Sequence, residues 1–144
     1  MYNVAIIGAG PAGIFAALEI TKLKPDWKVI LVEKGQKIEK RKCLLREGYE
    51  KCPSCKKCGL LCGWGGAGAF SDGKLTLTPD VGGHLVDYMK RDKVEELIDY
   101  ADSLYLDFGA TDEVFGTDMQ IFRELERQAA LAELKLVQIG RAHV

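Results

Sequence analysis

The stretch Tyr2-Asn-Val-Ala-Ile-Ile-Gly8-Ala-Gly10-Pro-Ala-Gly13 decides the fold of this 144-residue chain. Its apolar, β-branched first half predicts a buried strand, and its second half is the glycine pattern GxGxxG. Alanines and aliphatic residues then recur at helical spacing to about Leu23, and residues 28–32 (KVILV) predict a second strand that closes on Glu33. Strand, glycine turn, helix and strand in succession form a βαβ unit with parallel strands. The sequence therefore predicts an α/β fold with a parallel sheet.

The glycine turn is typical of a dinucleotide site because it follows a predicted strand and opens a predicted helix. Gly8 permits a sharp turn, Gly10 lets a diphosphate approach the backbone, and Gly13 lets the helix lie close to the strands. Pro11 and Ala12 occupy the first helical turn, where unpaired N–H groups and the positive end of the helix dipole face the diphosphate. We predict that these five residues bind the cofactor.

An acidic residue at the end of the second strand supports this interpretation. Glu33 follows Gly13 by twenty residues and is placed to accept hydrogen bonds from both ribose hydroxyls of an adenosine. Its charge would repel a 2′-phosphate, which argues against NADP at this site. Lys34 and Arg41 are the basic residues that we expect near the cofactor, although a solvated Arg41 is an equally open alternative.

Three segments of the chain together resemble the FAD-dependent dehydrogenases described as NAD(FAD)-utilizing. They are Gly8–Gly13, the run Glu33-Lys34-Gly35 with Arg41 beyond it, and Gly63–Leu75 (GWGGAGAFSDGKL). The resemblance covers Met1 to about Val137. It implies FAD held by a glutathione-reductase-like, Rossmann-like FAD/NAD(P)-binding domain, with a second glycine-rich loop near the flavin half of the cofactor, at Gly65, Gly66 and Ala67.

The family pattern also includes a substrate domain and a C-terminal segment that contacts the flavin, and neither is visible in this sequence. We therefore expect residues 1–138 to be the truncated N-terminal part of the FAD/NAD(P)-binding domain. The last six residues, 139–144, are expected not to be native, because codons for residues 138–144 (QIGRAHV) can spell a widely used sequencing-library adapter.

Four cysteines precede the second glycine loop, with two, two and three residues between them: Cys52, Cys55, Cys58 and Cys62. This is the ligand spacing of bacterial ferredoxin clusters, without the proline that usually follows the fourth cysteine, and it also suits zinc. A redox disulfide, Cys52–Cys55 or Cys55–Cys58, that exchanges electrons with flavin is a second possibility. Unliganded loop thiols are the third. Cys43 lies apart and has no assigned role.

The rest of the chain predicts a loop at 52–75, a short strand at 74–78, a helical insertion at 84–134 and a returning strand at 135–138. Within the insertion, one helix ends at Gly109 and another begins at the N-cap Asp118. Apolar residues recur on one face of each helix, and we expect both stripes to be core: Val94, Leu97, Ile98, Ala101, Leu104 and Phe108; Ile121, Leu125, Ala129 and Ala132.

Charge is balanced globally but unevenly distributed. The net charge is −1, so nothing points to nucleic acid. Residues 34–57 hold nine basic and three acidic residues, whereas residues 79–134 hold fourteen acidic and five basic. Either the two stretches are solvated surfaces, or the basic one lies near a phosphate-bearing cofactor. The apolar N-terminal segment lacks a positively charged leader and is too short to span a membrane, so we expect a cytoplasmic protein.

These observations favour an FAD-dependent oxidoreductase that acts on a small-molecule substrate, with NAD(P)H as a candidate electron donor. No catalytic side chain is assigned, because the flavin itself would transfer the electrons or hydride. Three alternatives stay open: a geranylgeranyl reductase-like flavoenzyme, an NAD-dependent dehydrogenase, and a non-catalytic module that carries zinc or an Fe–S cluster with a structural dinucleotide.

Overall fold

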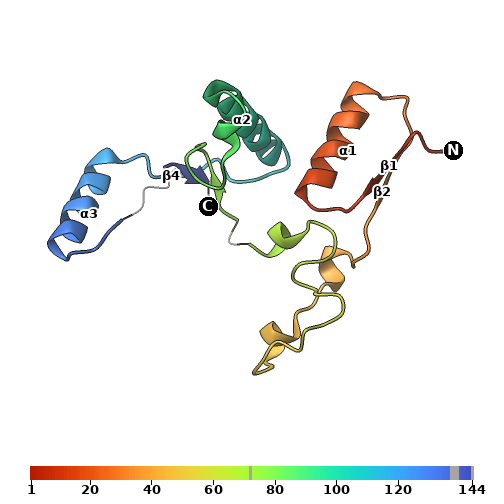
Figure 1. Ribbon diagram of the computed structural model, residues 1–144, viewed down its shortest axis with the longest axis horizontal. Helices are drawn as coiled ribbons and strands as arrows, with labels where there is room; N and C mark the ends of the chain where they lie inside the picture. The colour runs from red at the N-terminus through yellow and green to blue at the C-terminus, as the bar shows by residue number, and fades with distance from the viewer. Residues whose placement is uncertain (72, 137–139, 144) are drawn as a thin grey trace. The chain divides into compact units, whose positions relative to one another are not determined.

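The computed structural model describes residues 1–71, 73–136 and 140–143. The chain divides into two compact units, Met1–Ser71 and Asp72–Val144 (Figure 1). The first unit contains the predicted glycine fingerprint and the four-cysteine loop, and the second contains the predicted helical insertion.

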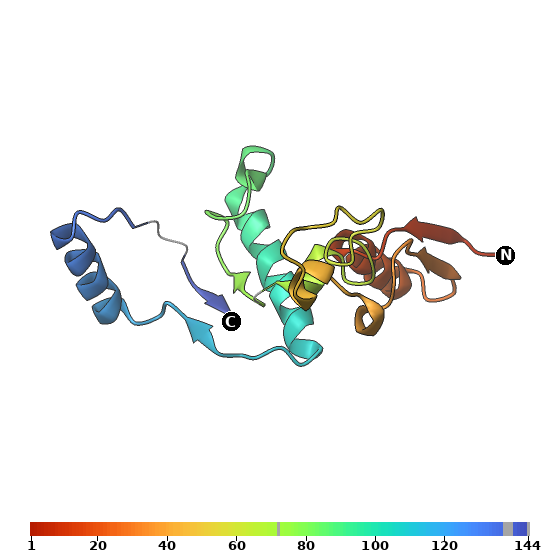
Figure 2. The ribbon, with the colours of Figure 1, turned by 90° about the horizontal axis from the view of Figure 1, so that it is seen from below.

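The first unit is built on the predicted strand–helix–strand succession. β1 (Val4–Ile7) and β2 (Val29–Val32) are parallel, in a register that pairs Val4 with Val29 and Ile7 with Val32. α1 (Pro11–Leu23) connects the two strands and lies beside them in Figures 1 and 2. The prediction of helices combined with a parallel sheet is confirmed. Both strands are shorter than predicted.

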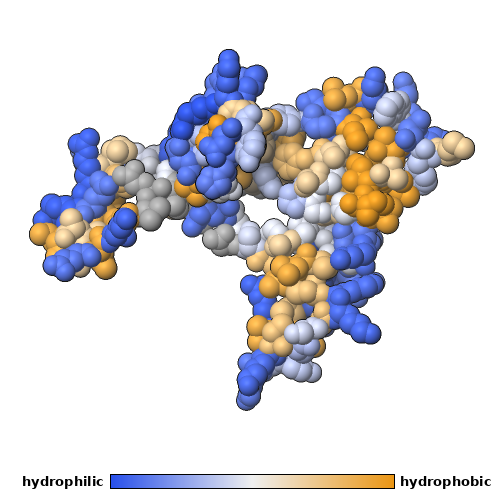
Figure 3. Space-filling view, viewed as in Figure 1, coloured by the Kyte–Doolittle hydropathy of each residue, from blue (hydrophilic) through white to orange (hydrophobic). Residues whose placement is uncertain are grey.

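The two-stranded sheet is not buried as the sequence suggested. Ile7 is 80% exposed and Val32 44% exposed, whereas Ala9, immediately after β1, is completely buried. Parallel strands become buried on both faces only when further strands and helices cover them, and the described part of this unit supplies one helix. Figure 3 shows the resulting apolar surface over α1 and the two strands.

Beyond β2 the backbone forms short 3-10 turns joined by loops. They are η1 (Ile38–Lys40), η2 (Leu44–Glu47) and η3 (Ala67–Phe70), and the cysteines lie between η2 and η3. Figure 3 shows hydrophilic residues along one side of the part of this unit that follows β2 and apolar residues over much of the other side. The charged segment that follows β2 therefore forms two separate turns, η1 and η2, rather than one continuous helix.

The second unit contains two helices and a small antiparallel sheet. After the turn η4 (Leu85–Asp87) come α2 (Arg91–Asp107) and α3 (Met119–Leu131). The sheet has the order β3–β5–β4, with β3 at Leu75–Thr76, β4 at Val114–Phe115 and β5 at Ala142–His143. Asp118 caps α3 as predicted, because its Oδ1 accepts hydrogen bonds from the backbone N–H groups of residues 120 and 121 at 2.9 and 3.1 Å.

The structure differs from the sequence-based predictions for the last strand and for the apolar helix faces of this unit. The returning strand predicted at 135–138 is absent at 135 and 136, and 137 and 138 are not among the described residues. β5 instead lies within the last six residues, which we expect from the sequence not to be native. The helix stripes are only partly core: Val94 and Ala129 are buried, but Phe108 is 77% exposed and Ile121 60% exposed, because the described residues of this unit leave much of each apolar face uncovered.

None of the helices among the described residues combines the length and the apolar character that crossing a membrane requires.

Candidate functional site

Ala9 joins the three segments from which the sequence predicts a cofactor site. Its N–H donates a 2.8 Å hydrogen bond to Glu33 Oε2, at the end of β2. Its carbonyl oxygen accepts a 2.8 Å hydrogen bond from the N–H of Gly65, in the second glycine-rich loop. Both groups of this fully buried residue are therefore used to hold the acid and the second loop against the fingerprint turn.

The fingerprint turn has the geometry that its glycines predict. A Cβ atom on Gly13 would lie 1.9 Å from the carbonyl oxygen of Gly8, so α1 reaches this close to the turn only with glycine at position 13. Gly8 itself adopts a φ of +106°, in the region that favours glycine. The predicted roles of these two glycines in turning the chain and packing the helix therefore agree with the structure.

The N-terminus of α1 presents backbone donors at this turn. The backbone N–H of Ile14 bonds to the carbonyl of Gly10 at 3.0 Å, so the N–H groups of Gly10, Ala12 and Gly13 precede the first turn of intrahelical bonds. Gly10 is the N-cap and supplies no side-chain cap, and Pro11 occupies the first helical position without an N–H of its own. These donors and the positive end of the helix dipole suit an anion.

The second glycine loop lies directly against this helix start. A Cβ atom on Gly66 would be 3.1 Å from Gly10 Cα and 3.3 Å from Pro11 Cδ, and Gly66 has a φ of +62°. A Cβ atom on Gly10, by contrast, would meet only Gly66 Cα, at 3.9 Å. The backbone of Gly10 therefore borders open space, as close approach of a diphosphate requires. Ala67 begins η3 beside this contact and is exposed.

The carboxylate of Glu33 is held in place by backbone donors. In addition to the bond from Ala9, its Oε1 accepts a 2.8 Å hydrogen bond from the N–H of Gly35. These two bonds, with smaller contributions from the Gly63 backbone and the charge of Lys34, outweigh partial desolvation and hold the pKa of Glu33 below its ordinary value. Each carboxylate oxygen keeps a further lone pair, so an ionised Glu33 can also accept bonds from two ribose hydroxyls.

The stretch after Glu33 packs on the second glycine loop through backbone alone. A Cβ atom on Gly35 would lie 2.5 Å from Gly63 Cα, and the N–H of Trp64 donates a 3.1 Å hydrogen bond to the carbonyl of Gln36. Larger residues at either glycine would push the two segments apart. This close contact explains why glycine is needed at Gly35 and Gly63, which sequence reasoning did not identify.

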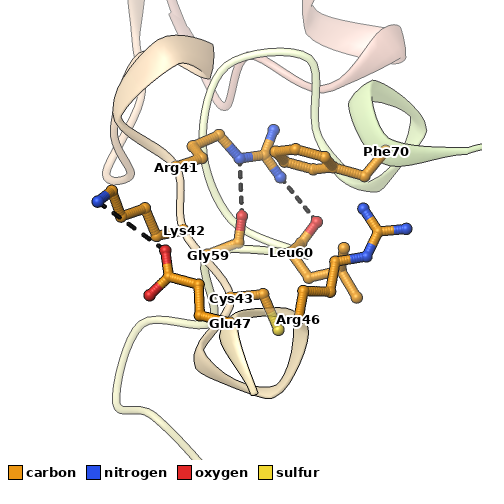
Figure 4. Close-up of a pocket in the computed structure, with 8 residues that line it drawn as sticks. All are labelled: Arg41, Lys42, Cys43, Arg46, Glu47, Gly59, Leu60 and Phe70. Atoms are coloured by element: carbon orange, nitrogen blue, oxygen red, sulfur yellow. Dashed lines mark hydrogen bonds and ion pairs between the residues drawn. The ribbon is translucent and has the colours of Figure 1, made fainter. Parts of the chain in front are cut away.

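The side chain of Arg41 is bound to backbone carbonyls later in the chain. Its guanidinium donates hydrogen bonds to three backbone carbonyls, at 2.9 Å to Gly59, 2.7 Å to Leu60 and 2.6 Å to Trp64. The side chain is only 6% exposed and lies 4.7 Å from the ring centroid of Phe70, beside a cavity of about 190 Å³ (Figure 4). Three of its five N–H donors bind loop carbonyls, so the loop is the partner that the geometry shows, and an approach of Arg41 to a phosphate stays a prediction.

The four cysteines are not gathered into one ligand set. All are free thiols; Cys52 and Cys55 are exposed, and Cys58 and Cys62 are half-buried. The N–H of Cys62 bonds to the carbonyl of Cys58 at 2.8 Å, which places these two residues one turn apart. Within the described ranges, no three side chains of the metal-ligating types come together as a metal site. The zinc or Fe–S site predicted from the spacing therefore has no geometric support here.

Comparisons with known proteins find similarity in the part of the chain that contains the glycine fingerprint. Residues 3–41 match the family model of the FAD binding domain, a range that contains β1, α1, β2 and Glu33. A protein of Clostridium beijerinckii, described as an uncharacterized protein, is 41% identical over 71 residues. The alignment covers 49% of this chain and 13% of the clostridial protein. No solved structure matches the chain. The family match supports FAD as the ligand of the segment at residues 3–41.

Proposed function

We propose that this chain supplies the dinucleotide-binding part of an FAD-dependent oxidoreductase of the dehydrogenase type. The observation that carries the proposal is the 2.8 Å hydrogen bond from Ala9 N–H to Glu33 Oε2. It brings the acid of the second strand to the glycine turn of the first, beside the open space at Gly10. A diphosphate and the adenosine ribose attached to it need binding groups this close together.

The backbone at the start of α1 would bind the diphosphate. The N–H groups of Gly10, Ala12 and Gly13 lie at the helix N-terminus, where donors and dipole both favour negative charge. Pro11 contributes a rigid first turn rather than a donor. This arrangement uses no basic side chain, which agrees with the commitment of Arg41 to the loop carbonyls.

Glu33 would bind the adenosine ribose and select the cofactor. The lowered pKa keeps the carboxylate ionised at neutral pH, so it acts only as a hydrogen-bond acceptor. Hydroxyl groups at both ribose positions satisfy this acceptor, whereas a 2′-phosphate would bring like charges together. Lys34, next along the chain, would lie on the adenosine side of the site.

The second glycine loop would contact the cofactor beyond its diphosphate. Gly65 is bonded to Ala9, and Gly66 lies against Gly10, so a cofactor seated at the helix start would extend along Gly66 and Ala67. Bound FAD would supply electron or hydride transfer, and these residues would orient it. We expect the residues that bind the substrate to lie outside the first unit, Met1–Ser71.

Calorimetric titration of the purified protein with FAD, NAD⁺ and NADP⁺ tests the proposal. We expect one FAD per chain and weaker binding of both nicotinamide dinucleotides, with NADP⁺ the weakest of the three because of Glu33. Binding of NAD⁺ in preference to FAD would redirect the assignment to an NAD-dependent dehydrogenase. Failure of all three to bind would contradict the proposal.

A further inference from the structure

A second concave site lies in the first unit, along the segment that follows Glu33, and it is lined in part by Lys34 and Gly35. It is a cavity of about 630 Å³ lined by the segment that follows β2 and by the end of the cysteine loop. None of its lining residues belongs to the turn at 8–13 or to the loop at 65–67. The volume falls within the range of small-molecule sites.

The lining of this cavity is strongly basic. Five of its residues are basic and one, Glu39, is acidic. Arg41 is committed to backbone carbonyls, and Lys42 lies 3.9 Å from Glu47, both side chains being well exposed to water. The basic residues with no such hydrogen bond or ion pair among the described contacts are Lys40 and Lys57, whereas Lys34 also contributes its charge to the neighbouring Glu33.

We propose that this lysine-lined cavity binds a small phosphate-bearing anion that is separate from the diphosphate of the dinucleotide. Ammonium groups on flexible stems donate up to three hydrogen bonds each and bind phosphate as point charges. Positive charges that line a concave surface concentrate positive potential more than the same charges would on a convex one. Free phosphate and the phosphate group of a nucleotide are both candidate anions, since both present the same chemistry to the lysines.

Two thiols in the same cavity provide a local reporter. Cys58 and Cys62 line it, whereas Cys52 and Cys55 are exposed on the preceding loop and are not part of the lining. An anion among the lysines would shield the first pair from an alkylating reagent and leave the second pair reactive. The chain therefore carries its own internal control for occupancy of this site.

The experiment uses FAD-saturated protein, so that the fingerprint turn is already filled. Iodoacetamide labelling of each cysteine is followed by peptide mass spectrometry, with inorganic pyrophosphate, ADP or adenosine added. With anion at about ten times its Kd, labelling of Cys58 and Cys62 should fall about tenfold, with Cys52 and Cys55 unchanged. Protection by pyrophosphate and ADP alike identifies phosphate as the determinant, and protection by ADP alone identifies a nucleotide. Protection by adenosine as strong as by ADP would overturn the proposal.

Charge-removing variants supply the matched comparison. Lys40→Gln and Lys57→Gln should each weaken pyrophosphate protection about two- to fivefold, the effect of losing one solvated ion contact. Lys51→Gln removes the same charge from an exposed residue outside the cavity and should have no effect. Equal behaviour of all three variants would overturn the proposal, as would protection that disappears once FAD is bound. If the chain takes up no FAD, the proposed function fails, whereas the lysine variants still decide this site without FAD.

Discussion

The backbone N–H of Ala9 and the carboxylate of Glu33 lie 2.8 Å apart although 24 positions separate them in the chain. The parallel register of β1 and β2 produces this contact, because it aligns Ile7 with Val32 and so brings the residues after each strand to the same edge. The acid is therefore fixed at the glycine turn by the protein's own backbone. A cofactor that binds here meets acceptors and donors already in position, which reduces the entropy lost on binding.

Replacement of Glu33 by Gln tests the role of its charge. The amide keeps the size of the side chain but removes the ionised acceptor, so FAD binding should weaken by about 1–3 kcal/mol, the loss expected for hydrogen bonds to a charged group. Calorimetry measures the change, with Glu50→Gln as a control that removes an exposed acid of the same unit. An unchanged FAD affinity in Glu33→Gln would mean that another residue holds the ribose.

Replacement of Gly10 by Val tests the open space at the helix start. The backbone of Gly10 is extended, with φ −79° and ψ 179°, so valine is compatible with it, and its Cβ would meet only Gly66 Cα, at 3.9 Å. The fold should therefore survive while the added methyl groups block the diphosphate, with loss of affinity of at least about a hundredfold, or about 2.7 kcal/mol. Gly68→Val is the control, because a Cβ at Gly68 meets nothing within 4 Å. Equal FAD affinity in both variants would place the diphosphate elsewhere.

Replacement of Arg41 by Lys tests the clamp on the second glycine loop. Lysine keeps the charge but cannot reach the carbonyls of Gly59, Leu60 and Trp64 together, so unfolding free energy should fall by about 2–4 kcal/mol. Urea unfolding followed by circular dichroism measures it. Arg46→Lys is the matched control, because Arg46 is exposed and lies 5.9 Å from the same Phe70 ring. A loss no larger than that of the control would show that the three hydrogen bonds contribute little.

The ion pair of Asp80 and Arg91 predicts a specific pH dependence in the second unit. Two short contacts, 2.7 and 2.8 Å, and a further bond from Thr78 lower the pKa of Asp80 from 3.8 to about 2. A carboxylate with a lowered folded-state pKa stabilises the fold above its unfolded pKa, and this contribution disappears as the pH falls through the folded value. Stability should therefore decline between pH 3.8 and about 2.

Chemical unfolding at several pH values checks this dependence. Asp80→Asn should flatten the decline over that interval, and Asp112→Asn, which removes an exposed acid of the same unit, should leave it in place. Both partners of the pair are more than half exposed, so the amplitude is expected to be small and to diminish at high salt. A decline that is as steep in Asp80→Asn as in the unmodified chain would contradict this assignment.

Short-range sequence patterns predicted the glycine fingerprint, whereas features that depend on contacts between distant residues were not predicted. The strand–helix–strand succession and the closeness of Gly13 to Gly8 follow from short-range spacing, which the sequence displays directly. The sequence indicated Arg41 only as a basic residue near the cofactor, because its buried position depends on carbonyls eighteen or more residues away.

The helices and the cysteines show the same limit. Helical periodicity identified the apolar face that contains Ile121 and Leu125. Periodicity does not show whether another element covers such a face, and in the described part of this unit most of this face is exposed. The spacing of the four cysteines fits a metal site. Spacing shows only that the thiols could reach one ion, and it does not show that the fold brings them together. Cys52 and Cys55 lie exposed instead.

The most direct test is a titration of the ¹⁵N-labelled protein with FAD, observed through its backbone amide resonances. The account predicts that Gly10, Ala12 and Gly13 shift at a stoichiometry of one FAD per chain, together with Ala9 and Gly35, whose N–H groups bond to Glu33. Saturation with FAD that leaves the amides of Gly10 and Gly13 unmoved would contradict the claim that these backbone groups bind the diphosphate.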